Sequence, residues 1–246
     1  MFICRDLGNI VNRENRKIRK GMIIRSSDLY ALDIKDTETV LGLGLRKVID
    51  LRTVFEAKEK PDAVYEGVAY LSCPLFEERT LGITRESQNN EISALMKMPY
   101  LGEVYRRMLS DEYSITMIRK VLHEIMDSDE YPVLFHCTAG KDRTGVIAFF
   151  VLYLLDVDYE TIIDDYLATN VFYTEKAQRT YDTILSLSND PKLAMKIKGF
   201  WMVRREYLED GLAGIIEEYG SIDDYIEKAL CIDKEKREAF KKKALI

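Results

Sequence analysis

The sequence predicts a single α/β domain, with a sheet of about four to five mainly parallel strands flanked by helices and a helical C-terminal third. Two observations predict this class. Short runs of β-branched and apolar residues alternate with helical patterns in the first half, and no strand pattern follows residue 158. We therefore expect one domain over residues 1–246, with an α/β core over 1–157 and a helical part over 158–246. Part of those helices can cover a site as a lid.

Four apolar runs are the predicted strands. Near-continuous apolar character over such short runs is typical of parallel strands buried on both faces. The runs are "GMIIRSS" (21–27), "RKVIDLR" (46–52), "VAYLSC" (68–73) and "YPVLFHC" (131–137).

Two helices are predicted between these strands. "DIKDTETVLGLGL", from Asp33, indicates a short helix that ends at glycines, and "SITMIRKVLHEIMD" (114–127) has four apolar residues on one stripe and Ser114 as a candidate cap. Alternating strands and helices place helices on both faces of the sheet. Four later segments also carry helical spacing: "DYETIIDDYLATN", "EKAQRTYDTILSLS", "PKLAMKIKGFWMVRREYLEDGLAGIIEEYG" and "SIDDYIEKAL".

Composition excludes several classes of protein. The net charge of −6 argues against binding nucleic acid through the overall field. The N-terminus does not resemble a signal peptide, and the longest apolar run (146–155) is shorter than the roughly 20 residues that span a bilayer. Four scattered cysteines form neither a disulfide framework nor a zinc site. We expect a cytoplasmic protein with reduced thiols, no metal or cofactor and no stable membrane insertion.

A basic cluster, "NRENRKIRK" (12–20), lies near the N-terminus. Such a cluster can reach an acidic membrane surface, although it is more typical of a solvated hairpin.

Three cysteines are followed six positions later by an arginine, which is the skeleton of a phosphate pocket with a covalent nucleophile. The segment 73–79, "CPLFEER", has no glycine and places Glu77 and Glu78 where a phosphate would sit. The segment 231–237, "CIDKEKR", also lacks glycine, carries two acidic residues and resembles the start of an exposed helix. Both segments are interpreted as chance matches.

The third segment has the local structure that this chemistry needs. In "YPVLFHCTAGKDRTGVIAFFVLYLL" an apolar strand enters a short loop that opens an apolar helix, so that backbone N–H groups and a helix N-terminus point at one spot. Gly140 permits the backbone conformation, and Arg143 can grip two phosphate oxygens. The same field favours the thiolate of Cys137, a nucleophile aimed at phosphorus. The alternative is a buried strand-end cysteine followed by a solvated arginine.

The stretch "HCTAGKDRTG" resembles the H-C-x5-R-[ST] signature of cysteine-dependent tyrosine phosphatases. It is closest to the atypical bacterial branch that also acts on phosphoserine, phosphothreonine and phosphoinositides. The sequence departs from that branch at Gly8-Asn9, where two glycines are frequent. Five further segments match it in content and order: "RDLGN" (5–9), "GMIIRSSDL" (21–29), "GLRKVIDLRTVFEAKEKPD" (44–62), "DDYLATN" (164–170) and "VRREYLED" (203–210).

The resemblance implies a phosphatase-like fold and two in-line displacements. The phosphoryl group passes to Cys137 and then to water, and the substrate is a phosphorylated protein or a phosphoinositide. No metal is implied, because Arg143 and the loop N–H groups carry the charge. The loop residues expected to bind phosphate are Thr138, Ala139, Gly140 and Lys141.

The leaving group needs an acid, and the Trp-Pro-Asp motif that supplies it in many relatives is absent. Asp142, inside the loop, is the expected general acid. Asp50 is the alternative, because it ends a predicted parallel strand where ligand sites gather. Asp50 and Arg52 are also candidates for phosphate binding, or for an ion pair that braces the loop.

Three more loop residues have two interpretations each. Thr144 can donate a hydrogen bond to the Cys137 sulfur or satisfy backbone at the helix start. The His136 ring can brace the loop backbone, as the resemblance implies, or be an ordinary strand-end histidine. Lys141 is either a second cation, of the kind that goes with polyanionic headgroups in related enzymes, or a solvent-facing lysine.

Three rival functions stay open at the level of sequence. The first is an inositol-polyphosphate phosphatase that uses the same loop. The second is a phosphate-binding pseudophosphatase, against which the intact Cys137 and Arg143 speak. The third is a sulfurtransferase, but the arginine and the Lys-Asp pair fit phosphate better.

Overall fold

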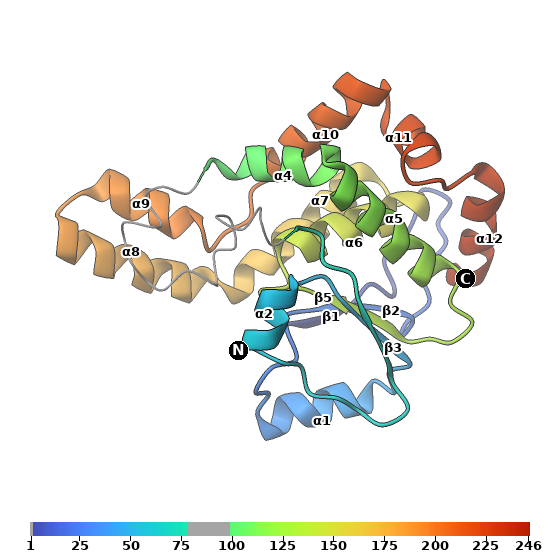
Figure 1. Ribbon diagram of the computed structural model, residues 1–246, viewed down its shortest axis with the longest axis horizontal. Helices are drawn as coiled ribbons and strands as arrows, with labels where there is room; N and C mark the ends of the chain where they lie inside the picture. Colours follow the sequence, from blue (N-terminus) through green and yellow to red (C-terminus); the bar gives the residue numbers. More distant parts are fainter. Residues whose placement is uncertain (1, 78–98) are drawn as a thin grey trace.

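A five-stranded sheet forms the centre of the computed structural model, which describes residues 2–77 and 99–246 (Figure 1). The strand order is β1-β2-β5-β3-β4, and all neighbouring strands are parallel except the β1–β2 pair. The predicted sheet of four to five mainly parallel strands is confirmed. The strands are β1 (Cys4–Asp6), β2 (Ile23–Ser26), β3 (Lys47–Asp50), β4 (Ala69–Ser72) and β5 (Val133–His136).

Two details of the strand prediction were incomplete or wrong. Strand β1 was not predicted, because its three residues, Cys-Arg-Asp, show no apolar run. Strand β4 was expected to be buried on both faces, yet Ala69, Tyr70 and Ser72 are exposed. The reason is its position at the edge of the described sheet, which periodicity along the chain does not reveal.

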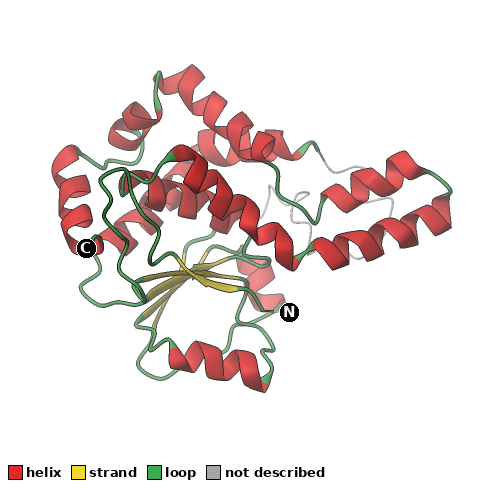
Figure 2. Cartoon of the chain, turned by 180° about the vertical axis from the view of Figure 1, so that it is seen from behind, coloured by secondary structure: helices red, strands yellow, loops and turns green. Residues whose placement is uncertain are grey.

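Helices cover both faces of the sheet, as predicted (Figures 1 and 2). Apolar strand residues alternate between two clusters, so that Ile24, Val48 and Leu134 pack on the side of α1 (Ile34–Gly42). The larger cluster contains the adjacent strand residues Ile23, Ile49 and Phe135. It also includes residues of α4 (Leu101–Ser110), α5 (Glu112–Met126) and α6 (Asp142–Leu154).

The predicted start of α1 is correct, because the Asp33 side chain accepts a hydrogen bond from the N–H of Asp36. The predicted cap of α5 is wrong. Asp111 is the N-cap and accepts from the N–H of Ser114, which lies inside the first turn. The Ser114 hydroxyl instead donates to the carbonyl of Leu75.

The described residues after 158 form helices, as predicted. Helices α8 and α9 make a hairpin that projects from the body, whereas α10 lies along α4 (Figure 1). Leu208 and Tyr225 belong to the same core cluster as Phe135 of β5, so the core is continuous through both parts of the chain. A lid role for the projecting hairpin stays a prediction. These elements are α7 (Tyr159–Ala168), η2 (Thr169–Phe172), α8 (Thr174–Ser188), α9 (Pro191–Gly199), α10 (Arg205–Tyr219), α11 (Ile222–Lys228) and α12 (Lys234–Ala244).

Within residues 2–77 and 99–246, none of the helices combines the length and the apolar character needed to cross a membrane.

Candidate active site

The loop that follows β5 lies at the carboxyl end of the sheet, between two neighbouring strands. His136, the last residue of β5, is paired in register with Ser26 of β2 and Asp50 of β3, so three strands end at the same level. Ligand sites of open α/β sheets gather at this edge. The fold therefore places the predicted loop, beginning at Cys137, where such sites occur.

Gly140 is held against β2 by a close backbone approach. Its φ is +63°, and a Cβ atom built there would lie 2.7 Å from the carbonyl oxygen of Ser26. A side chain would meet both a strained conformation and a clash. The left-handed φ agrees with the expectation that Gly140 permits the backbone conformation of the loop.

The loop leads directly into α6, which begins at Asp142 with Lys141 as the N-cap. None of the described side chains caps this end of the helix, and the N-terminus of a helix favours a bound anion. Cys137 lies just ahead of them and is 2% exposed. The arrangement suits an anion bound over the cysteine.

Arg143 is fixed by a residue to which the sequence analysis gave no role. Its Nη1 and Nη2 donate to the two carboxylate oxygens of Glu56, in α2 (Val54–Glu59), at 2.6 and 2.8 Å. This bidentate contact holds the plane of the guanidinium in one orientation. Arg143 is therefore preorganised and does not have to be ordered by the substrate.

Glu56 is saturated with donors and stays ionised. It also accepts from the N–H of Thr53 and the hydroxyl of Thr138. Burial, the largest single effect, raises its pKa, but the Arg143 charge and these hydrogen bonds together outweigh it and lower the pKa of Glu56 to about 2. The T-x-x-E capping box of Thr53 and Glu56 is the sequence signal for this helix start.

Asp142, the expected general acid, is held by a tyrosine from another helix. The hydroxyl of Tyr105, in α4, donates to Asp142 Oδ1 at 2.8 Å and lies 2.7 Å from the hydroxyl of Tyr166, in α7. Both tyrosines are almost fully buried. The contact with Tyr105 therefore orients the carboxyl group of Asp142.

Asp50 and Arg52 form an ion-pair cluster. Arg52 is 1% exposed, and its guanidinium binds Asp50 and Asp62, both at 2.8 Å, and the carbonyl of Lys60 at 2.7 Å. Phosphate binding by Arg52 is not what this geometry favours, because each of its guanidinium nitrogens already has a partner. The contacts show the ion pair of Asp50 and Arg52, and the bracing of the loop by this pair stays a prediction.

The ring of His136 contacts carboxylates and does not reach the loop backbone as the resemblance implied. Its Nε2 lies 3.0 Å from Asp62 Oδ2, and neither ring nitrogen forms a hydrogen bond to the backbone. Burial alone lowers the pKa of His136, but the nearby carboxylates of Asp50 and Asp62 outweigh it and raise the pKa.

Asp50, Asp62 and His136 also form, within the described residues, a group whose donor atoms are close enough to hold a metal ion. The guanidinium of Arg52 already binds both of these carboxylates and supplies the positive charge. The donor set therefore fits a buried arginine cluster better than a metal centre.

Lys141 is buried, which corrects the alternative of a solvent-facing lysine. It is 0% exposed, and its Nζ donates to the carbonyls of Phe200 and Trp201 at 3.2 and 3.3 Å. The ammonium also lies 4.7 Å from the ring centroid of Tyr173. Lys141 thus connects the loop to the segment between α9 and α10.

Neither role expected for Thr144 is realised in this structure. Its hydroxyl is buried and has no hydrogen-bond partner among the described residues, whether the sulfur of Cys137 or a backbone group.

Arg25 of β2 contacts the loop directly, and Arg5 of β1 contributes through a shared carboxylate. Arg25, 1% exposed, donates to the carbonyl of Gly140 at 3.1 Å and pairs with Asp165 at 2.6 Å. Arg5 pairs with the other oxygen of Asp165 and donates to Thr169. These contacts give a physical reason for the matching segments "RDLGN", "GMIIRSSDL" and "DDYLATN", whose roles the sequence analysis left unassigned.

The other two cysteines that are followed six positions later by an arginine, Cys73 and Cys231, do not lie in a comparable anion-binding loop. Burial, the largest effect, raises the pKa of the Cys73 thiol to about 11, which opposes a nucleophilic role. Arg79 and Glu78, of the same pattern, lie outside the described residues. Cys231 is exposed, and Arg237 pairs with Asp156 and Asp223 in the α12 region. Neither cysteine lies at a loop of the kind that follows β5.

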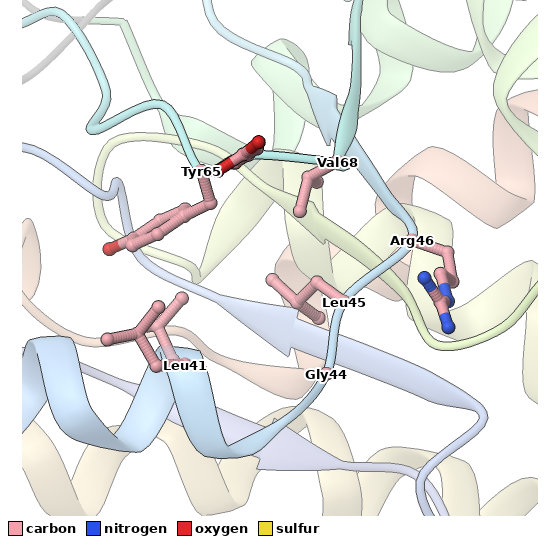
Figure 3. Close-up of a pocket in the computed structure, with 8 residues that line it drawn as sticks. Leu41, Gly44, Leu45, Arg46, Tyr65 and Val68 are labelled. Atoms are coloured by element: carbon pink, nitrogen blue, oxygen red, sulfur yellow. The ribbon is translucent and has the colours of Figure 1, made fainter.

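A separate pocket of about 230 Å³ lies between the end of α1 and the turn before β4. Figure 3 shows Leu41, Leu45, Tyr65 and Val68 around it, and none of its lining residues belongs to the loop that follows β5. This pocket is not the candidate active site.

Comparison with known proteins decides the family. The model of a tyrosine phosphatase family matches residues 2–246. The chain belongs to the tyrosine phosphatase family. The triple specificity protein phosphatase PtpB of Mycobacterium tuberculosis is 30% identical over 245 residues, which cover 86% of this chain and 87% of PtpB.

A second relative of this phosphatase comes from Cupriavidus necator and carries the name of a tyrosine-protein phosphatase. It is 28% identical over 238 residues, covering 94% of this chain and 82% of the relative. A solved structure of P. aeruginosa TpbA in complex with phosphotyrosine is 13% identical, covering 82% of this chain and 90% of TpbA, with a TM-score of 0.36. That similarity is too low to support a conclusion about the phosphatase.

Proposed function

We propose that this phosphatase hydrolyses phosphotyrosine and also alkyl phosphomonoesters, such as phosphoserine and phosphothreonine, through a phosphocysteine intermediate on Cys137. The observation that carries the proposal is the preorganised Arg143, which Glu56 holds in the first turn of the helix that follows the cysteine loop. The name of the relative PtpB, a triple specificity phosphatase, agrees with a broad substrate class.

In the first step the Cys137 thiolate attacks phosphorus, a P–S bond forms and the P–O bond to the leaving group breaks. Asp142 transfers a proton to the departing oxygen, so that the alcohol leaves neutral. Arg143 and the N–H groups of the loop and α6 stabilise the charge on the three other phosphoryl oxygens. No metal is required in this scheme.

In the second step water attacks the phosphocysteine. The Asp142 carboxylate takes a proton from the water, the P–S bond breaks, and inorganic phosphate and the thiolate are released. The same residue thus serves as acid and then as base, and it ends each cycle protonated.

The acid matters for the choice of substrate. A tyrosine leaving group, with a pKa of about 10, departs with less proton transfer than the more basic alkyl alcohols. An acid fixed inside the loop, and oriented by Tyr105, supports activity on the harder alkyl esters.

Phosphoinositides are the substrates for which this structure offers less support. The expected second cation, Lys141, is bound to the carbonyls of Phe200 and Trp201 and would have to leave them to reach a headgroup. We therefore place phosphopeptides ahead of phosphoinositides and soluble inositol phosphates in the expected order of kcat/KM.

The test is phosphate release, in EDTA, from a phosphotyrosine peptide, a phosphoserine peptide, phosphoinositide vesicles and a soluble inositol phosphate. Acid quenching during turnover, followed by mass spectrometry of the peptide that contains Cys137, should show one added phosphoryl group. The mechanism would be refuted if the phosphoryl group were found on a histidine or an aspartate and not on the cysteine. It would also be refuted if EDTA abolished the activity. A preference for inositol phosphates over both peptides would refute the proposed substrate class.

A further inference from the structure

The two basic segments of the chain lie side by side, although more than two hundred residues separate them. Lys17 and Ile246 exchange two backbone hydrogen bonds, both of 2.9 Å, and Ile18 pairs with Leu245. The guanidinium of Arg16 also donates to the carbonyl of Leu245. We call residues 13–20 and 241–246 together the basic end.

The basic end opposes the charge of the rest of the molecule. It contains eight Lys or Arg residues and one acidic residue, Glu14, so it carries a formal charge of +7. Since the net charge of the chain is −6, the other 232 residues carry −13. Only the first segment stands out as a basic cluster in the sequence, because the proximity of the two segments depends on the fold.

Most of this positive charge is not neutralised by neighbouring carboxylates. Arg13 and Lys241 form ion pairs with Asp158 and Asp156. The other six cations have no carboxylate partner among the described residues. Lys17, Lys20 and Lys242 are exposed, and Arg16, Arg19 and Lys243 donate to backbone carbonyls, which leaves their charge in place.

Exposed apolar side chains accompany these cations. Ile18 and Leu245 point into the core, with 0% and 2% exposure. Val11 and Ile246, both backbone partners of Lys17, are 41% and 62% exposed. The surface is therefore both basic and apolar, which is the composition of peripheral membrane-binding surfaces.

The basic end lies at the opposite end of the sheet from the catalytic loop. Strand β2 begins at Ile23, directly after the basic hairpin, and ends at Ser26, against Gly140. In Figure 1 the C-terminus and α12 lie at the right, whereas α2, which carries Glu56, lies at the left. The basic end is therefore not an extension of the phosphate site.

We propose that the basic end binds the surface of anionic phospholipid membranes and leaves the catalytic loop facing the aqueous phase. Clusters of four to eight Lys and Arg are sufficient for this attraction, and apolar side chains add a second contribution that a soluble polyanion does not use. The basic end contains no aromatic residue on which unpaired bases could stack, so single-stranded nucleic acid fits it less well. The proposal is independent of the substrate class argued above.

The experiment is co-sedimentation of the full chain with two kinds of vesicle. One kind contains phosphatidylcholine alone, and the other also contains about 30% of the anionic lipid phosphatidylserine. We expect binding only to the anionic vesicles, and its loss as salt is raised toward about 1 M, where the Debye length is about 3 Å. The double variant Lys17→Glu/Lys242→Glu, with one change in each segment, should bind at least about 100-fold more weakly.

The matched control is Lys35→Glu/Lys192→Glu, which makes the same change of charge at two exposed lysines of α1 and α9. It should bind vesicles like the wild type. All variants should hydrolyse a soluble aryl phosphate at the wild-type rate, which shows that they are folded. Absence of binding to anionic vesicles, or an equal loss in the control variant, would overturn the proposal.

A second variant separates lipid from other polyanions. Val11→Thr/Ile246→Thr removes exposed apolar surface and leaves every charge in place, so it should weaken binding to anionic vesicles several-fold without changing binding to heparin. Binding to heparin or duplex DNA that exceeds vesicle binding, with no effect of these two substitutions on the vesicles, would assign the basic end to a soluble polyanion instead and would overturn the membrane assignment.

Discussion

Tyr105 and Asp142, from two different helices, are joined by a hydrogen bond of 2.8 Å. The tyrosine hydroxyl also lies 2.7 Å from that of Tyr166, so a chain of three groups ends on the proposed acid. A hydrogen bond donated to a carboxylate favours its ionised form and fixes its orientation. We therefore expect Tyr105 to position the proposed acid.

Replacement of Tyr105 by Phe should lower kcat on alkyl phosphates by about tenfold, a fraction of the 10²–10⁴ that a general acid contributes. The loss on an activated aryl phosphate should be smaller, because that leaving group depends less on the acid that Tyr105 orients. The matched control is Tyr153→Phe, because the hydroxyl of Tyr153 donates to the distant Asp223. An equal loss on alkyl and aryl phosphates in Tyr105→Phe would show that the contact is only structural.

Asp142→Asn should lose far more rate on phosphoserine than on an activated aryl phosphate, because proton donation matters in proportion to how basic the leaving group is. The comparison is the ratio of kcat values on the two substrates for each variant. Equal losses on both would mean that Asp142 positions the loop. Asp50→Asn is the matched variant. Because Asp50 forms an ion pair with Arg52 in the wild type, we expect this variant to lose the same fraction of kcat on both substrates.

Glu56→Gln should destabilise the protein in a manner that depends on pH. The folded-state pKa of Glu56 is lowered to about 2 from an ordinary value of 4.5. Its stabilisation is therefore fully present above about pH 4.5 and is lost as the pH falls through about 2. It amounts to about 3 kcal/mol at neutral pH, at 1.36 kcal/mol per pKa unit.

Urea unfolding of the wild type and Glu56→Gln at pH 6 and pH 3 checks this prediction, and the difference in the free energy of unfolding should be clearly smaller at pH 3. Glu59→Gln, at an exposed position of the same helix, should show almost no difference at either pH. A difference for Glu56→Gln that is constant across this range would contradict an ionised, arginine-paired Glu56.

Cys137→Ser should abolish turnover and keep the binding of phosphate, because the Arg143 and N–H groups remain while a serine hydroxyl is not ionised at neutral pH. Phosphate release measures the first effect, and the rise of the melting temperature with added phosphate measures the second. Turnover at the wild-type level would refute the covalent mechanism.

Arg237→Ala should lower stability without lowering catalysis. Arg237 binds Asp156, Asp223 and the carbonyls of Tyr153 and Leu154. Loss of these part-buried contacts should cost about 2 kcal/mol in the free energy of unfolding. The kcat/KM measured well below the melting temperature should stay within a few-fold of the wild type. A loss of two decades would mean that Cys231 had been wrongly dismissed.

The local features of this protein were determined by its sequence. Cys137, Gly140 and Arg143 lie within seven residues of one another, and the strand before them and the helix after them have their own apolar patterns. A strand, a loop and a helix that follow each other directly can form an anion site whatever the rest of the chain does. The parallel sheet and the helical last third also follow from periodicity that is read along the chain.

The tertiary structure alone decided which distant residues serve that loop. Glu56 reaches Arg143 across 87 positions, and Tyr105 reaches Asp142 across 37. Neither pair is related by helical or strand spacing, so only the order of strands and the packing of helices bring them together. The same holds for the exposed edge strand β4, whose burial depends on its neighbours in the sheet, and for the basic end, which exists because residues 16–19 pair with the final residues of the described chain.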